Sequence, residues 1–442
     1  MRISRQPSEY NLTVVALLSI LITFFVCLTA KLHHFFEILC NFAAKMKNEA
    51  TIAFVREHCD DDVRALALQA RRDGDVDLPW ALDQIQGRQT ARRKLPSWAA
   101  TDGIVYPPHL SMEQCSSEQT ALYKCAIVED LPKSCRRTLI DLTGGFGVDF
   151  AFMARHFEQA CYVERQEHLC ETARHNFEKL GLKHVRVVHD EAENVLKGLD
   201  CEPSSTLIYL DPARRDNNSG RTYAIADCTP DVLAMKNRLL EVSHHVLVKL
   251  SPMLDWHKTV SDLGECVAEV HIVSVANECK ELLVLMTTDH QGDPVVHCVN
   301  DEQSLVFSSS DGDEGLVLAR SEEAVYLFEP NASVMKAGCF GVLTRRYPVA
   351  ALAVDSHLFV ACEDVEDFPG RRFKVSAVTS MNKKELGRAL SGITRANVAV
   401  RNFPMTAQQL RQRLRLQDGG DIYIFGTTTA DGNHLLYICR KL

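Results

Sequence analysis

The stretch Leu139-Ile140-Asp141-Leu142-Thr143-Gly144-Gly145-Phe146-Gly147-Val148-Asp149 decides the fold of this chain. Its first residues, together with Thr138, are apolar or β-branched, which predicts a short buried strand that ends at Asp141. Residues 151–155 predict a helix. The three glycines between them predict a tight turn in which the backbone can approach a ligand closely. Many α/β folds use such a turn without a ligand, so the residues that follow must decide its role.

The residues after this stretch alternate between strand and helix patterns. Further strands are predicted at 160–164, 185–190, 206–211 and 245–250, and a helix over 168–180 ends at Gly181. Two last strands, at 267–275 and 282–286, are separated by a short turn and predict a hairpin. Strands that alternate with helices indicate a parallel sheet, so the predicted fold class is α/β.

Acidic residues end four of these strands, at Asp141, Glu164, Asp190 and Asp211. The carboxyl ends of parallel strands lie along one edge of the sheet, where open α/β sheets bind their ligands. Glu164 lies about twenty residues past the glycines, where a carboxylate can accept hydrogen bonds from both hydroxyls of a ribose. Asp190 is placed to receive an adenine amino group. The spacing alone therefore suits a dinucleotide or an adenosine ligand.

The segment Asp211-Pro212-Ala213-Arg214-Arg215 follows the fourth strand directly. With the glycine stretch, Glu164 and Asp190, it resembles the motifs of class I S-adenosylmethionine-dependent methyltransferases, over about residues 117–289. The resemblance implies a Rossmann-like methyltransferase sheet with S-adenosylmethionine as cofactor. The cofactor-binding residues that it implies are Asp141, Thr143, Gly145, Gly147, Glu164 and Asp190. The catalytic residues that we expect are Asp211, Pro212, Arg214 and Lys249.

The acceptor atom stays open between a base nitrogen and a ribose 2′-hydroxyl. The family's second proline and aromatic residue are replaced here by Ala213 and Arg214, which weakens the case for a base nitrogen and leaves Arg214 to stack on a base or hold a phosphate. No cysteine lies in 211–215 or 249–253, which argues against C5-methylation, because that reaction needs a thiolate. Lys124, Asp211, Lys249 and Glu278 are similar in order and spacing to the Lys-Asp-Lys-Glu tetrad of 2′-O-ribose methyltransferases, where a lysine deprotonates a hydroxyl.

The C-terminal segment is basic, whereas the whole chain has a net charge of −9. Residues 371–442 carry 13 Lys and Arg against 4 Asp and Glu, a net of +9, so the remainder sums to −18. The runs 368–373, 396–404 and 418–425 look like the THUMP-like domain that follows the catalytic domain in a group of uncharacterised bacterial methyltransferases. True THUMP domains bind RNA, and phosphate contacts supply non-specific RNA affinity. The resemblance and the charge together predict an RNA partner, tRNA or rRNA, bound by Arg371, Arg372, Lys383, Lys384, Arg395 and Arg401.

The sequence pattern and this resemblance together divide the chain into five parts. We expect an apolar extension at 1–45, a helical N-terminal domain at 46–116, the methyltransferase domain at 117–328, a ferredoxin-like domain at 329–371 and a THUMP-like α+β domain at 372–442. Residues 12–30 are nearly all apolar, which suits a short membrane anchor, a signal segment or a gene start placed too far upstream of Met46. We favour the last of these, and with it a cytoplasmic protein.

The 16 cysteines form no Cys-x-x-Cys pair and no Cys/His cluster with zinc spacing, so the sequence predicts reduced thiols and no metal site. The most consistent interpretation is an S-adenosylmethionine-dependent methyltransferase that acts on RNA. A non-catalytic RNA-binding protein that retains the cofactor fold and a small-molecule methyltransferase are the alternatives.

Overall fold

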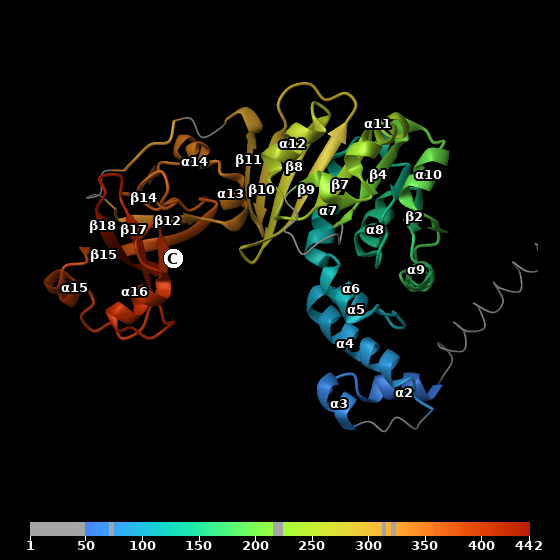
Figure 1. The fold of residues 1–442 in the computed structure, drawn as a ribbon, viewed down its shortest axis with the longest axis horizontal. Coiled ribbons are helices and arrows are strands. Elements are labelled where there is room, and N and C mark those ends of the chain that lie inside the picture. The colour runs from blue at the N-terminus through green and yellow to red at the C-terminus, as the bar shows by residue number, and fades with distance from the viewer. Residues whose placement is uncertain (1–48, 70–74, 215–223, 312–314, 320–323) are drawn as a thin grey trace, which may run out of the picture. The chain divides into compact units, whose positions relative to one another are not determined.

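The computed structural model describes residues 49–69, 75–214, 224–311, 315–319 and 324–442 (Figure 1). The apolar segment 12–30 lies outside these described residues. Among the residues that are described, no helix combines the length and the apolar character needed to cross a membrane. The chain divides into two compact units, with the boundary between Cys115 and Ser116.

The described part of the first unit is helical. Its helices are α2 (Glu49–Glu57), α3 (Val63–Gln69), α4 (Leu78–Lys94), α5 (Pro96–Ala99) and α6 (His109–Gln114). Asp77 caps α4 by accepting a hydrogen bond from Trp80 N, and Pro79 sits in the first turn, where its missing N–H is not needed. The buried Gln84 side chain pairs with the backbone of Tyr106 through two hydrogen bonds, of 2.9 and 2.8 Å, and so fixes the segment that returns past α4.

The second unit is built on a large sheet. Its strands are β1 (Thr138–Asp141), β2 (Gln159–Glu164), β3 (Val185–His189), β4 (Thr206–Leu210), β7 (His245–Leu250), β8 (Val267–Val275), β9 (Glu278–Thr287), β10 (Val295–Asn300) and β11 (Gln303–Ser308). In the described part of the chain these make one nine-stranded sheet in the order β11-β10-β8-β9-β7-β4-β1-β2-β3. The strands β3, β2, β1, β4 and β7 are parallel, and β9 runs antiparallel between β7 and β8. The predicted parallel α/β sheet and its closing hairpin are confirmed.

Helices cover both faces of this sheet. The helices that accompany the large sheet are α7 (Glu118–Asp130), α8 (Val148–Met153), α9 (Glu167–Lys179), α10 (Ala192–Gly198), α11 (Val232–Val242) and α12 (Trp256–Leu263). The contacts separate them into two groups, α7 with α8 and α10 with α11 and α12. Ser117 caps α7 through Thr120 N, as its position before an apolar run predicts. A short ribbon of β5 (Ala213–Arg214) and β6 (Cys228–Thr229) stands beside the sheet.

The C-terminal region forms a second sheet. Its strands are β12 (Tyr326–Pro330), β13 (Ala350–Ala351), β14 (Phe359–Ala361), β15 (Gly370–Ser380), β16 (Asn397–Arg401), β17 (Ile422–Thr428) and β18 (His434–Lys441). Their order is β13-β14-β12-β15-β18-β17-β16 among the described residues. Its helices are α13 (Ala332–Ala337), α14 (Phe340–Arg346), α15 (Lys383–Ala389) and α16 (Ala407–Leu414). The strands β15 to β18 and the helices α15 and α16 give residues 370–441 the mixed α and β content that the sequence predicts.

A buried carboxylate joins the interior strand β12 of this second sheet to its edge strand β16. Glu329 on β12 accepts a hydrogen bond from Arg371 Nε at 2.8 Å and one from Arg401 at 2.9 Å. Arg401 ends β16, which is the opposite edge strand from β13 and is separated from β12 by β15, β18 and β17. The sheet must therefore curl strongly, and the apolar side chains inside the curl, among them Leu327 and Phe425, form one core cluster.

Candidate functional site

The glycine turn joins β1 to α8 and leaves no room for larger side chains at two positions. A Cβ on Gly144 would lie 2.1 Å from the Tyr162 ring, and one on Gly147 would lie 2.8 Å from the Phe177 ring. Gly147 also has a φ of +84°, which favours glycine. By contrast, a Cβ on Gly145 would meet nothing closer than the Thr143 carbonyl oxygen at 3.9 Å. The turn is thus tightly packed underneath and open on the side of Gly145.

Glu164, the last residue of β2, is hydrogen-bonded to the glycine turn at Gly145, on its open side. Its Oε2 accepts a hydrogen bond from Gly145 N at 2.9 Å, and its Oε1 accepts one from Gln166 N at 2.8 Å. The Tyr162 hydroxyl donates to the Gly145 carbonyl oxygen. A buried carboxylate is therefore fixed against the backbone of the glycine turn at the carboxyl edge of the sheet.

Asp141 and Thr143 connect the turn to the Asp211-Pro212 segment. Asp141 Oδ1 accepts a hydrogen bond from Thr143 N at 2.9 Å, and the Thr143 hydroxyl accepts one from Asp211 N at 2.6 Å. Burial raises the pKa of Asp141 well above its ordinary value, although the bond from Thr143 opposes this. These contacts bind the end of β1 to the end of β4.

A cluster of charged side chains lies beside the turn. Asp149, in the first turn of α8, has Oδ1 3.2 Å from Lys124 Nζ and Oδ2 3.7 Å from Lys249 Nζ. Lys124 Nζ also donates to Glu281 Oε1 at 2.7 Å, and Lys249 Nζ donates to Asp211 Oδ2 at 2.5 Å. Acids and lysines therefore alternate from the buried Glu281 to Asp211, whose side chain is 40% exposed.

Two hydroxyl groups complete the surroundings of Asp149. Ser116 Oγ and the Tyr209 hydroxyl each donate to Asp149 Oδ2 at 2.8 Å. Ser116 precedes α7 and Tyr209 lies on β4. The carboxylate of Asp149 thus gathers an α7 lysine, a β7 lysine and a β4 tyrosine around the start of α8.

Burial and charge set the ionisation of this cluster. Burial opposes the ionisation of Asp149, but Lys124 and Lys249 outweigh it and lower its pKa to about 2. Burial likewise lowers the pKa of Lys249, yet Asp211, Asp149 and Glu281 together raise it above its ordinary value. Burial raises the pKa of Glu281. Lys249 is therefore a charged ammonium at neutral pH, and Asp211 is the carboxylate of the cluster that faces outward.

Glu281, and not the predicted Glu278, lies in this charged cluster. The Glu278 side chain is 74% exposed and pairs with Lys280 on the surface, whereas Glu281 is buried against Lys124. The pairing of β9 with β8 shifts register between these two residues, so the regular alternation of side chains along a strand does not decide which of them faces inward. The spacing in the sequence could not separate two glutamates that lie three residues apart.

The remaining predicted residues of this region lie at the same edge. Asp190 follows β3, is exposed and accepts hydrogen bonds from Glu191 N and Asn194 Nδ2, which lower its pKa. Pro212 is buried directly after β4. The Arg214 backbone pairs with Cys228 in β5, and its side chain lies outside the described residues.

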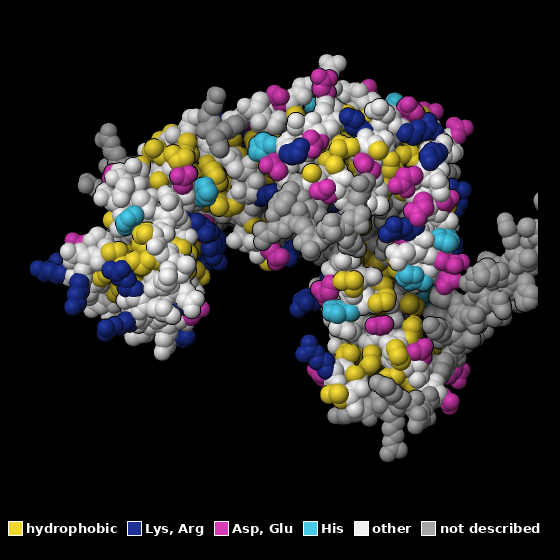
Figure 2. All heavy atoms as spheres, in the orientation of Figure 1, with side chains coloured by type: hydrophobic (Ala, Val, Ile, Leu, Met, Phe, Trp, Pro, Cys, Tyr) yellow, Lys and Arg dark blue, Asp and Glu magenta, His cyan; other side chains and the backbone are white. Residues whose placement is uncertain are grey.

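The predicted RNA-binding residues fall into two groups. Arg371 and Arg401 pair with the buried Glu329, and Arg372 pairs with Asp364 at 2.6 Å. Arg395 is exposed and donates to the Asp418 carbonyl oxygen at 3.2 Å. Lys383 and Lys384 are exposed in the first turn of α15. Figure 2 shows Lys and Arg side chains gathered over the end of the module that carries α15 and α16.

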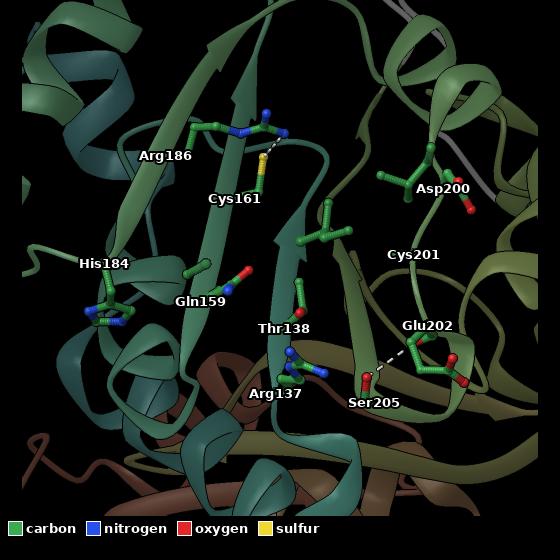
Figure 3. Close-up of a pocket in the computed structure, with 13 residues that line it drawn as sticks. Arg137, Thr138, Gln159, Cys161, His184, Arg186, Asp200, Cys201, Glu202 and Ser205 are labelled. Carbon is green, nitrogen blue, oxygen red and sulfur yellow. Dashed lines mark hydrogen bonds between the residues drawn. The ribbon is translucent and has the colours of Figure 1, made fainter.

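A hollow of about 550 Å³ lies at the opposite edge of the sheet (Figure 3). Thr138 and Gln159, the first residues of β1 and β2, line one side, and Glu202 and Ser205 line the other. In open α/β sheets ligands bind at the carboxyl ends of the strands, and this hollow lies at the amino ends. It is therefore separate from the candidate site.

Sequence reasoning missed Ser116, Asp149, Tyr209 and Glu281. Asp149 stands in the decisive stretch itself, but an acid in the first turn of a helix is also what the helix dipole favours, so the pattern gave no separate signal. Tyr209 and Glu281 lie inside strands whose inward positions became known only with the register of β4 and β9.

We expect replacement of Asp149 by asparagine to remove a pH-dependent part of the stability. Its folded pKa of about 2 lies below the ordinary 3.8, so its ionised form stabilises the fold above about pH 4, and this contribution is lost as the pH falls through its folded pKa. The difference in unfolding free energy between wild type and Asp149→Asn should shrink by about 2 kcal/mol from about pH 5 to about pH 2. Urea denaturation measures this difference. Parallel curves for the two proteins would contradict the assignment.

Several solved structures share part of this fold. SMU.1697c of Streptococcus mutans, solved with SAH, is 17% identical, with a TM-score of 0.28 over 38% of this chain and 96% of its own. An O-methyltransferase candidate of Klebsiella pneumoniae is 13% identical, with a TM-score of 0.32 over 51% of this chain and 95% of its own. Such low TM-scores support no conclusion about this chain. None of the curated proteins matches it.

A much fuller match comes from the "putative methyltransferase" of Porphyromonas gingivalis W83. It is 29% identical to this chain, with a TM-score of 0.77, over 89% of this chain and 98% of its own. The family model described as a ferredoxin-like domain matches residues 326–369, and the one described as THUMP domain-like matches residues 370–441. The chain therefore resembles this methyltransferase-fold protein over most of its length, and its C-terminal part carries a ferredoxin-like and a THUMP-like domain.

Proposed function

We propose that this protein is an S-adenosylmethionine-dependent methyltransferase that acts on RNA. The observation that carries the cofactor part is the pairing of Glu164 with the open side of the glycine turn. The turn has a close-packed base at Gly144 and Gly147 and free space above Gly145, and a buried carboxylate lies within hydrogen-bonding distance of its backbone. Such an arrangement suits a ligand with a ribose beside a charged, extended chain.

The residues at this edge fit the cofactor. Glu164 would accept hydrogen bonds from the ribose hydroxyls, and the exposed Asp190 lies one strand further along, on the side where an adenine would lie. Asp141, Thr143, Gly145 and Gly147 would form the wall beside the amino-acid part. S-adenosylmethionine supplies an electrophilic methyl group, so the protein has only to align the acceptor and remove its proton.

Asp211 is our choice for the residue that receives the acceptor. Its carboxylate is partly exposed at the end of β4 and accepts a hydrogen bond from Lys249, and its backbone N–H donates to the Thr143 hydroxyl. A carboxylate in this position can accept a hydrogen bond from an amine or a hydroxyl and orient its lone pair. Lys249 stays charged and serves to position Asp211, and Pro212 and Arg214 are the further residues that we expect to take part. The acceptor is a base nitrogen or a ribose 2′-hydroxyl.

The RNA part of the proposal rests on the THUMP domain-like match and on the basic end of that domain. The two exposed lysines of α15 stand near the exposed Arg388 on the same helix. Exposed cations grouped in this way contact phosphates and release counterions on binding. A non-catalytic RNA-binding protein would bind RNA without transferring a methyl group. A small-molecule methyltransferase would bind the cofactor without binding RNA.

Glu164→Gln should weaken the binding of S-adenosylmethionine. A charged acceptor of ribose hydrogen bonds contributes about 1.5–3 kcal/mol, so the dissociation constant should rise about 10- to 100-fold. Titration calorimetry on the full chain measures it, with the exposed Glu167→Gln on α9 as the matched control. If wild type binds no S-adenosylmethionine, the enzyme proposal is wrong; if both variants bind equally, the role of Glu164 is wrong.

Lys249→Met should lower methyl transfer and leave cofactor affinity nearly unchanged. Without the ammonium, Asp211 loses the partner that fixes its position, and general acid–base effects of this kind are worth about 100-fold or more in rate. Transfer of a labelled methyl group from S-adenosylmethionine to bulk cellular RNA measures it. The exposed Lys258→Met on α12 is the control. Equal turnover in the two variants would remove Lys249 from the site.

The double variant Lys383→Ala and Lys384→Ala should weaken binding to bulk tRNA and reduce the slope of affinity against salt by about 1 to 2, because each phosphate contact contributes about one unit. The pair Arg440→Ala and Lys441→Ala, equal in charge and exposed on β18, is the control. Filter binding over a range of salt concentrations measures both. Undiminished tRNA binding and methylation in the α15 variant would place RNA elsewhere, and methylation of small molecules without tRNA binding would favour the small-molecule alternative.

A further inference from the structure

Two histidines and a glutamate meet on the sheet face that α7 covers, and the proposed methyl transfer uses none of them. Glu269 and His271 are two residues apart on β8 and therefore share a face. His297 on β10 is the register partner of His271 in the parallel pair of strands. The two imidazole rings stack with centroids 4.4 Å apart and an angle of 17° between their planes. One potential ligand atom from each residue lies within 4.8 Å of the other two.

The buried ring of His271 has a nitrogen with no hydrogen bond. Only 3% of His271 is exposed, and within the described part of the chain its Nε2 has no hydrogen-bond partner. Glu269 Oε2 is 3.0 Å from this nitrogen, but the pair does not meet hydrogen-bond geometry. Glu269 Oε2 also lies 3.5 Å from His297 Nε2. Two ring nitrogens thus face one carboxylate oxygen, and a buried polar atom among them is left unsatisfied, which costs free energy unless something binds it.

Tyr123 on α7 fixes the other side of the His271 ring. Its hydroxyl lies 2.9 Å from His271 Nδ1. When Nδ1–H donates to this hydroxyl, Nε2 carries a lone pair that faces Glu269, and a proton or a metal ion between the two makes the contact favourable. Metal-binding histidines typically engage their second ring nitrogen in such a bond, which sets the tautomer and the ring orientation.

The side chains of the cluster offer the kinds of atom that bind a metal ion. Glu269 offers a carboxylate oxygen, and His271 and His297 each offer an imidazole nitrogen. Glu269 and His297 are partly exposed, so an ion can reach them from the surface.

We propose that Glu269, His271 and His297 form a binding site for a divalent transition-metal ion, with zinc as the expected occupant. Two imidazole nitrogens and one carboxylate oxygen are ligands that zinc and its neighbours in the first transition row prefer, whereas magnesium and calcium prefer oxygen ligands alone. Bonds of about 2.0–2.2 Å place the atoms around a tetrahedral zinc ion about 3.4 Å apart. Two of the separations here, 3.0 and 3.5 Å, are close to that value.

The ion has a role that follows from its place. It ties β8 to β10, and through the Tyr123 bond to His271 it holds α7 against the sheet. The next residue on α7 is Lys124, which pairs with Asp149 and Glu281. The metal site therefore supports the helix that supplies one of the two lysines around Asp149. Three protein ligands leave a fourth position, which the partly exposed Glu269 and His297 leave accessible to water.

Cobalt and zinc titrations of the full chain, stripped of metal by a chelator, test this proposal. We expect one cobalt ion per chain with the visible absorption of a tetrahedral nitrogen and oxygen site, and its loss when zinc is added. Because the chain has 16 cysteines, the spectrum must lack the thiolate-to-cobalt band; such a band would overturn the assignment. Zinc should also raise the thermal unfolding midpoint of the wild type.

Matched variants locate the ion. His297→Gln and Glu269→Gln, both partly exposed and therefore mild for folding, should weaken zinc binding at least about 100-fold, and Tyr123→Phe about 10-fold. His257→Gln on α12, whose side chain is 67% exposed, is the control and should bind as wild type does. Failure of the wild type to bind zinc or cobalt, or equal affinity in His297→Gln, Glu269→Gln and His257→Gln, would overturn the proposal. S-adenosylmethionine affinity measured alongside reports separately on the proposed function.

Discussion

The candidate site depends on one buried carboxylate, that of Asp149. It lies between the ammonium groups of Lys124 and Lys249 and also accepts hydrogen bonds from two hydroxyls. Removal of a partner from a buried ion pair leaves an uncompensated charge, which costs about 3–5 kcal/mol. Because Asp149 stands in the first turn of α8, the same contacts that neutralise it also fix the helix that follows the glycine turn. The ion pairs of Asp149 with Lys124 and Lys249 therefore help to set the shape of the glycine turn, to which Glu164 is hydrogen-bonded.

Helix α7 connects this charge cluster to the rest of the sheet. Its residues Tyr123 and Lys124 are consecutive, yet the first contacts His271 on β8 and the second contacts Glu281 on β9. On the sheet, His271 stands opposite Leu283, and Glu281 stands opposite Val273, so both anchor points lie on the same face. A shift of α7 would disturb both at once. The helix therefore holds the hairpin of β8 and β9 in register with the parallel strands, whose carboxyl ends form the candidate site.

The sequence predicted those features that depend on local pattern or on fixed spacing. The parallel strands and the closing hairpin follow from apolar periodicity, and Glu164 follows from its distance to the glycines. Glu281 could not be distinguished from Glu278, because the register of β8 and β9 shifts at a bulge between Val273 and Ser274. The cluster of Glu269, His271 and His297 could not be predicted for a similar reason. Glu269 and His271 give no signal of their own within a strand, and His297 lies beside them because β10 pairs in parallel with β8. Tertiary contacts, rather than neighbours in the chain, decide which residues join each of these two clusters.

The structure also shows which positive charges of the C-terminal module are already paired with acids. Residues 371–442 sum to +9, but Arg371, Arg401 and Arg372 are paired with Glu329 and Asp364, which lie outside that segment. Glu329 pairs with Arg401 across the curl of the sheet and so joins β12, which opens the ferredoxin-like domain, to the last residue of β16. These arginines form ion pairs across the boundary between the ferredoxin-like and the THUMP-like domain, which share one sheet. Part of the positive charge that remains for a phosphate backbone lies on exposed residues of α15 and α16, and an RNA contact is accordingly expected on these helices.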